Sequence, residues 1–154
     1  MIYLFKEDPK NKIYYSLLDF LRTVAKEFIL VKRTQLKFDN TAELLLKELS
    51  SNLVNKIQAS EWPGTKLLGK ANAEIFRFKV NLVSIDILKR YSNCLSDWSA
   101  PKLPEDLAFF RQDNCVIFGS VIHEKEYWLD LNETELNIII NRYPNLESIL
   151  IKPK

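Results

Sequence analysis

Apolar residues recur at two different spacings along the chain, and the spacing changes from one segment to the next. From about Lys12 to Phe28 they follow the three-to-four-residue period of an amphipathic helix. From Ala73 to Val80 they alternate with charged residues, which is the two-residue period of a half-buried strand. The chain therefore mixes helices and strands that each turn one face toward a core.

Three further segments are predicted to be helical, each starting at an asparagine that can cap the first turn. They run from Asn40 to about Ala59, from Asn81 to Tyr91, and from Asn132 to Tyr143. Glu43 and Glu135 stand three residues after the first and last caps, which is the spacing of a capping box. The middle segment is apolar over more than half of its circumference, so we expect it to lie well inside the protein.

Further strands are expected from about Phe28 to Phe38, from Asn114 to Ile122, from Tyr127 to Leu131 and from Ser148 to Lys152. Apolar residues on both faces of the run Cys115–Ile122 favour a central strand, although this pattern also fits a short buried helix. Pro63 and Gly64 predict a type II turn from Trp62 to Thr65. The fold class expected for residues 1–154 is a single α+β domain, an antiparallel sheet with packed helices.

The chain is expected to organise around the stretch from Trp98 to Glu124, where two prolines stiffen the loop that enters the apolar run. A stiff loop that carries Trp98, Glu105 and Asp106 is a candidate recognition edge. The alternative is that the adjacent acids, which follow Pro104, cap a short helical turn.

Composition is that of a soluble globular protein, with 154 residues, 47% hydrophobic and 27% charged. No apolar run approaches the roughly 20 residues of a membrane span, and the N-terminus does not have the layout of a signal peptide, so we expect a cytoplasmic protein without membrane contact. Cys94 and Cys115 are too isolated for a disulfide framework and are expected to be reduced and buried.

The net charge of +2 conceals an acidic C-terminal third, which carries nine acids and six bases from residue 101 onward. Its acids include Glu124, Glu126 and Asp130, which would speed the encounter with a basic partner. The alternative interpretation is an ordinary solvated face. Basic residues elsewhere are scattered among acids, so nucleic-acid binding is not expected.

Candidate catalytic chemistry is sparse. His123 is the single histidine, and a strand over this region would put it on the face opposite Ser120, so the two would not form a nucleophile and base pair. A transition-metal site needs more His or Cys ligands, so no metal is expected; we expect no cofactor either. His123 is predicted to hydrogen-bond Glu124 or a loop carbonyl. The three glycines cannot form a phosphate-binding loop.

Four short motifs occur in a fixed order: W-P-G-T at Trp62, W-x-x-P at Trp98, P-E-D-L at Pro104 and H-E at His123. In this order they resemble a family of small, functionally uncharacterised cytoplasmic bacterial proteins. Members of that family look like the immunity proteins encoded beside polymorphic bacterial toxins, and the resemblance brings no enzymatic activity with it.

The sequence therefore predicts a non-enzymatic protein-binding module, immunity-like, that neutralises a partner toxin through an acidic, aromatic-containing edge. The residues predicted to bind the partner are Trp98, Glu105, Asp106, His123, Glu124, Glu126 and Asp130. The competing hypothesis is a small-molecule hydrolase or ligand-binding regulatory domain with a pocket among Trp98, Glu105, Asp106 and His123. A third hypothesis is a scaffold that self-associates.

Overall fold

The computed structural model describes all 154 residues. The strands are β1 (Ile2–Phe5), β2 (Glu27–Arg33), β3 (Leu53–Ala59), β4 (Glu61–Trp62), β5 (Thr65–Lys66), β6 (Ala73–Lys79), β7 (Glu105–Phe110), β8 (Val116–Val121), β9 (Glu126–Asp130) and β10 (Leu150–Ile151). The helices are α1 (Lys12–Val24), α2 (Asn40–Leu49), α3 (Leu82–Tyr91), α4 (Glu133–Arg142) and α5 (Pro144–Glu147), with 3₁₀ turns η1 (Ser50–Asn52), η2 (Leu95–Asp97) and η3 (Ile122–Glu124).

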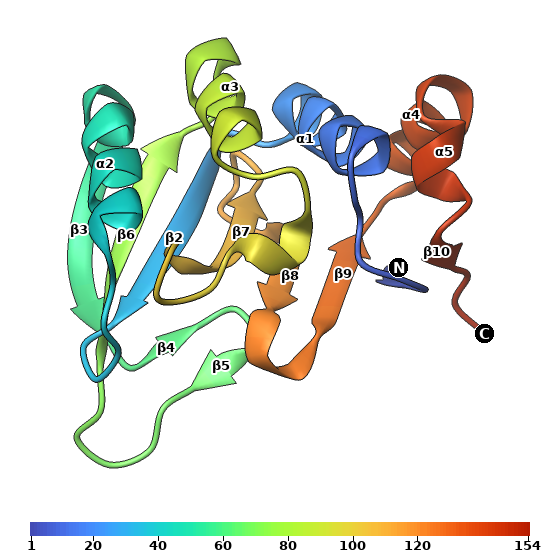
Figure 1. Cartoon of the computed structure of the whole chain (residues 1–154). Helices are drawn as coiled ribbons and strands as arrows, with labels where there is room; N and C mark the ends of the chain where they lie inside the picture. The colour runs from blue at the N-terminus through green and yellow to red at the C-terminus, as the bar shows by residue number, and fades with distance from the viewer.

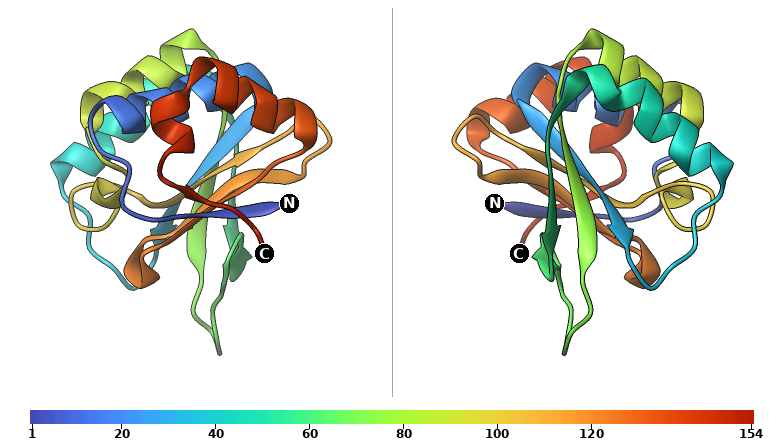
Figure 2. Two further views of the ribbon diagram at one scale, coloured as in Figure 1. Left: turned by 90° about the vertical axis from the view of Figure 1, so that its right-hand side faces the viewer. Right: turned by 90° about the vertical axis from the view of Figure 1, so that its left-hand side faces the viewer.

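Eight strands form one antiparallel sheet in the order β10-β1-β9-β8-β7-β2-β6-β3, and β4 pairs with β5 in a separate hairpin. The helices gather on one face of this sheet, which we call the helix face (Figures 1 and 2). The main core, a cluster of 29 buried residues, lies between the helices and the sheet. A second cluster of seven buried residues, which includes Trp62 of the hairpin, lies on the opposite face of the sheet, which we call the open face. The predicted α+β class, with an antiparallel sheet and packed helices, is confirmed.

Strand alternation divides the side chains between the two faces. In β2, Phe28 and Leu30 join the main core under the helices, whereas Ile29 and Val31 join the open-face cluster. The apolar run predicted as a central strand is β8, which lies between β7 and β9 in the sheet. It is not a buried helix, and the prediction of a central strand is confirmed.

Helix starts agree with the capping signals in two of three cases. Asn81 and Asn132 each accept a hydrogen bond from a backbone N–H in the first turn, and the residue three positions later completes the capping box. The third cap is Asp39 rather than Asn40, because the Asp39 side chain accepts from the Thr41 N–H. The Glu135 carboxylate also binds the Arg111 guanidinium, which ties the β7–β8 turn to the start of α4.

Two predicted helices are too long. The helix predicted to reach Ala59 ends at Leu49, and Leu53 and Ile57 lie in strand β3. A spacing of four residues fits both a helical period and an alternating strand, so the pattern did not separate the two, and β6 provides the partner that selects the strand. The first helix ends at Val24, because Ala25 is extended, and Phe28 pairs with Phe78 in the sheet.

Other predictions about burial and local structure are also wrong. Helix α3 is a surface helix rather than one that lies well inside: one side, with Ile85, Ile87 and Leu88, packs in the main core, whereas Leu82 and Val83 in its first turn are 66% and 59% exposed. Glu105 and Asp106 begin strand β7 and cap no helical turn, since β2 and β8 pair with this segment on either side. The thiols are free, as expected, but Cys115 is exposed and Cys94 half-buried, since Cys115 follows the β7–β8 turn and Cys94 lies in the short segment between α3 and η2.

Candidate functional site

A cluster of buried charged residues, which we call the buried charged cluster, lies at the start of β7. Glu105 and Asp106 have no solvent-exposed surface, although both are acids at the start of a strand. Asp106 has a positive φ of 54°, and the register between β2 and β7 shifts at this point. Because of this bulge, the two consecutive acids can both point away from solvent and toward Arg33, the last residue of β2.

Asp106 links three segments that are far apart in the sequence. One carboxylate oxygen accepts a hydrogen bond from the Trp62 indole N–H at 2.9 Å, and the other accepts from the backbone N–H of Ile122 at 3.0 Å. The Arg33 guanidinium lies 3.6 Å from the same carboxylate and 5.4 Å from the centre of the Trp62 ring. Asp106 therefore fixes the β4–β5 hairpin and the 3₁₀ turn η3 against the sheet.

Glu105 has poorer partners. Its carboxylate oxygens lie 2.6 Å from His123 Nε2 and 3.5 Å from Arg33 Nε, but neither oxygen has a partner with hydrogen-bond geometry. Burial raises the pKa of Glu105 above its usual value; the charge of His123 opposes this increase and the nearby Asp106 adds to it. His123 itself is half exposed and forms the outer edge of the cluster.

A second feature lies beside this cluster on the open face, where β9 and β1 are neighbours. Tyr127 and Leu129 of β9 point into the main core, so the alternate residues of the strand lie on the open face. The set formed by these residues and the adjacent apolar residues of β1 is Ile2, Leu4, Glu126, Trp128 and Asp130. We call this set the acidic-aromatic surface.

The acidic-aromatic surface combines exposed apolar residues with two acids, one on each side of a single tryptophan ring. Ile2 is 48% and Leu4 51% exposed, and in the sheet they pair with Asp130 and Trp128. A shallow groove of about 390 Å³ extends between Leu4 and Trp128. Glu126 and Asp130 are four residues apart in one strand, so their backbones are separated by about 14 Å with the Trp128 ring between them.

Two glycines hold the Trp128 ring in place. A Cβ atom on Gly119 would lie 2.1 Å from the ring, and one on Gly64 would lie 2.8 Å from it. The ring therefore packs directly against backbone of β8 and of the β4–β5 turn. Gly64 has φ +82°, as the predicted turn requires after Pro63. Its position beside Val121 brings the hairpin onto the open face.

Trp98 is not part of either feature, and its predicted role in partner binding is wrong. The ring has no exposed surface and lies in the core on the helix face, where its indole N–H donates to the Tyr14 hydroxyl at 3.0 Å. Trp98 follows the 3₁₀ turn η2 and packs beside Tyr14 of α1 in the main core, so the large ring is buried rather than available to a partner. The predicted pocket among Trp98, Glu105, Asp106 and His123 does not form, because the sheet separates the tryptophan from the others.

The other predicted residues fall into two groups. Glu105 and Asp106 are buried beside His123, so the two acids are not surface contacts as predicted, and His123 meets Glu105 rather than Glu124 or a carbonyl. The predicted surface residues Glu124, Glu126 and Asp130 retain exposed side chains at η3 and along β9, although Asp130 contacts the N-terminal ammonium group at 3.2 Å.

Several residues of these two features were not predicted from the sequence to be site residues. They are Arg33, Trp62, Trp128, Ile2 and Leu4. Trp128 could have been found, because the alternation within Glu126–Asp130 places it on the same face as the two acids. No local signal connects Arg33 to Asp106, which are 73 positions apart in the sequence.

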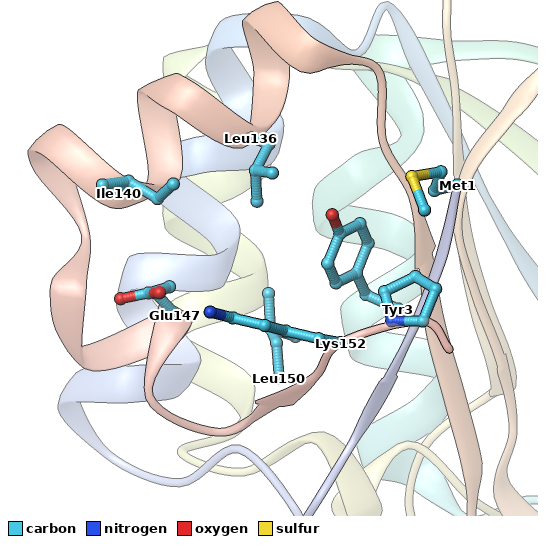
Figure 3. Close-up of a pocket in the computed structure, with 8 residues that line it drawn as sticks. Met1, Tyr3, Leu136, Ile140, Glu147, Leu150 and Lys152 are labelled. Carbon is cyan, nitrogen blue, oxygen red and sulfur yellow. The ribbon is translucent and has the colours of Figure 1, made fainter.

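A separate pocket of about 320 Å³ lies between α4 and the strands at the two termini (Figure 3). Its walls are mostly apolar, with Tyr3, Leu136, Ile140 and Leu150. Glu147 and Lys152 also line it, and they are its two charged side chains.

No cluster of three or more His, Cys, Asp or Glu side chains has the arrangement of a metal site. None of the helices combines the length and the apolar character needed to cross a bilayer. Comparison of the chain with protein-family models, with curated proteins and with solved structures gives no match. The resemblance based on the four short motifs therefore stays a prediction.

Proposed function

We propose that this chain is a non-enzymatic protein-binding module that meets a basic partner protein through the acidic-aromatic surface. The observation that carries the proposal is that Glu126 and Asp130 flank Trp128 beside the exposed Ile2 and Leu4. An aromatic ring in an apolar surround supplies desolvation energy, and acids at its margin select a partner of opposite charge. In an immunity-like role, that partner is a toxin whose active surface is basic.

The buried charged cluster supports this proposal because of the segments that it holds in place, and not because of any reaction that it could catalyse. Glu105 and Asp106 have no exposed surface, so no substrate reaches them in this conformation. Their contacts instead hold η3 and the β4–β5 turn, which border the acidic-aromatic surface on one side. The cluster therefore acts as a support for a surface whose shape must persist before binding.

The test is binding to a basic protein captured with this chain from its native host. Changing Glu124, Glu126 and Asp130 to lysine should abolish or strongly weaken binding, because three attractive charges become repulsive. The matched control reverses three exposed acids on helices α2 and α3 of the helix face, Glu43, Glu48 and Asp86, and changes the net charge by the same amount. The proposal requires that this control retain binding.

Two results contradict the proposal. If both triple variants weaken binding equally, net charge matters and the surface does not. If the captured partner binds the first variant as well as the unchanged protein, the acids of η3 and β9 are only a solvated face.

A second candidate function is ligand binding in the pocket between α4 and the termini (Figure 3). Its volume is at the lower end of the range for small-molecule sites, and its walls are apolar with two charged groups. A small amphiphile should then raise the melting temperature, and Ile140→Glu should remove that increase. The same change should leave protein binding at the acidic-aromatic surface intact.

A further inference from the structure

We propose that two copies of this chain associate through strand β3, which pairs antiparallel with itself in a register centred on Ile57 and joins the two sheets into one. This inference does not depend on the proposed function, because β3 and the acidic-aromatic surface lie toward opposite ends of the sheet.

The two edges of the sheet differ in length and exposure. At one end, β10 is two residues long, too short to offer much backbone to another strand. At the other end, β3 has seven residues, and all of them are exposed except the last, which is half-buried. Since β3 pairs only with β6, half of its backbone donors and acceptors face outward. Such an edge is a template for a further strand unless the protein blocks it.

The usual blocking devices are weak along β3. It contains no proline, and its only charged residue is Lys56, whose ammonium lies 2.9 Å from the Glu74 carboxylate of β6. Lys56 is the one charge on β3 that could prevent another strand from pairing there, and this ion pair holds its ammonium over β6, away from the free edge. The register shift in β3 lies before Asn55, so the five residues from there to Ala59 remain regular and available.

An apolar row on the open face ends abruptly at this edge. The row crosses the sheet from Val31 in β2 to Ile75 in β6 and then to Ile57 in β3, and these residues are paired in register. Their exposed fractions are 0%, 6% and 51%, so the row is buried until its last member. A second β3 centred on Ile57 places its own isoleucine directly opposite and continues the row through Ile75 and Val31 of the second copy.

Charge selects this register over its neighbours. In an antiparallel pair centred on Ile57, Lys56 faces Gln58 of the other copy and Asn55 faces Ala59, so no like charges are opposed. A shift centred on Lys56 would set the two ammonium groups against each other, which destabilises a strand pair. A shift centred on Asn55 would pair Lys56 with Val54 and bring no second isoleucine to Ile57. The occupant that suits this edge is therefore β3 itself.

The first experiment is sedimentation velocity of the full chain over a range of protein concentrations, with Ile57→Lys and Leu82→Lys as matched variants. We expect a reversible dimer whose dissociation constant increases at least about tenfold in Ile57→Lys, since the new lysines oppose each other. Leu82 is also an exposed apolar residue, on α3, and its variant should dimerise normally. A protein that stays monomeric up to its solubility limit overturns the proposal, as does a dimer that tolerates Ile57→Lys.

The second experiment tests the register and keeps the proposal falsifiable if the lysine variant does not fold. In a background with Cys94→Ser and Cys115→Ser, Ile57→Cys should form a disulfide-linked dimer on mild oxidation, because the two Cα atoms are about 5 Å apart in the proposed pair. The control is Asn55→Cys on the same face, whose Cα atoms would be about 14 Å apart. Equal cross-linking of both variants, or none with Ile57→Cys, overturns the register.

Discussion

Trp98 and Trp62 illustrate how similar residues in similar sequence surroundings acquire different roles. Each ring stands near a proline, yet Trp98 lies in the main core, whereas Trp62 of strand β4 lies in the open-face cluster on the opposite side of the sheet. Both indole N–H groups have a buried acceptor, the Tyr14 hydroxyl in one case and the Asp106 carboxylate in the other. For residues of this kind, the hydrogen-bond partner decides where the ring fits as much as its size does.

Replacing Trp98 by alanine should lower the free energy of unfolding by roughly 3 to 5 kcal/mol, because the change leaves a large cavity and removes the indole N–H that donates to the Tyr14 hydroxyl. Urea denaturation measures the effect. Trp98→Phe is the control: it preserves most of the volume and should recover more than half of the loss. A Trp98→Ala protein as stable as the unchanged chain would contradict the buried position of this ring.

Glu105 should make the stability of the protein fall as pH rises. Its pKa is raised in the folded state by burial, so between the unfolded value and the higher folded value the native protein binds more protons than the unfolded chain. The contribution is therefore fully present below the ordinary glutamate pKa and is lost as pH rises through the folded pKa. Glu105→Gln should remove this dependence, as measured by unfolding at a series of pH values.

Glu135 provides a control of opposite sign. Burial alone would raise its pKa, but hydrogen bonds from the Arg111 side chain and the Asn132 backbone N–H lower it below the ordinary value. Its contribution to stability is present above the unfolded pKa and is lost as pH falls through the folded pKa. Glu135→Gln should therefore flatten the acid side of the profile. If both variants changed the profile in the same direction, the difference between the two carboxylates would be disproved.

At the scale of elements, the contact between β8 and β9 depends on a residue without a side chain. Gly119→Ala would place a Cβ atom 2.1 Å from the ring of Trp128, the residue that pairs with Gly119 in the neighbouring strand β9. At this distance the ring has to move. We expect a lower melting temperature, a shifted tryptophan emission and weaker binding to the partner protein.

Gly69→Ala is the control for the glycine substitution. Gly69 has φ +68°, but a Cβ atom added there would meet no other atom within 4 Å, so alanine should cost only about 1 kcal/mol of backbone strain. The tryptophan emission of this variant should not change. An emission shift of similar size in both variants would show that the effect of Gly119→Ala is not local to Trp128.

The element least visible in the sequence is β3. Leu49, Leu53 and Ile57 are four residues apart, and this spacing satisfies a helix and an alternating strand equally well. In the structure the helix ends at Leu49 and a 3₁₀ turn separates it from the strand. The capped segments were easier to predict, because an Asn that accepts from a backbone N–H three residues later specifies a helix start locally.

At the scale of the whole molecule, binding at the acidic-aromatic surface should separate into two kinetic effects. Reversal of Glu124, Glu126 and Asp130 should mainly lower the association rate and its dependence on salt, because charges outside the contact core act over a Debye length. Trp128→Ala should mainly raise the dissociation rate, because the ring becomes fully desolvated only in the complex.

Surface-immobilised binding measured at two salt concentrations distinguishes these effects. Both variants should remain folded, since Trp128 is only half-buried and the three acids contribute little to stability. If the charge reversal left the association rate and its salt dependence unchanged, long-range attraction would play no part in recognition.

The sequence by itself determined the features that depend on neighbours in the chain. These are the α+β class, the central strand β8, the capped starts of α3 and α4, and the Pro63-Gly64 turn. It also placed Glu124 and Glu126 at exposed positions, because both belong to the run of polar residues from His123 to Glu126 that joins two apolar strands.

Only the tertiary structure decided which faces are covered and which distant residues meet. The neighbours of Asp106 are Arg33, Trp62 and Ile122, which come from three separate segments of the chain. The local sequence of a segment does not specify which other strands it lies beside in the sheet. Trp98 is fully buried and Trp128 only half-buried for the same reason: one ring lies under the helices and the other on the open face. Periodicity assigns residues to faces, but packing between elements decides which face is covered.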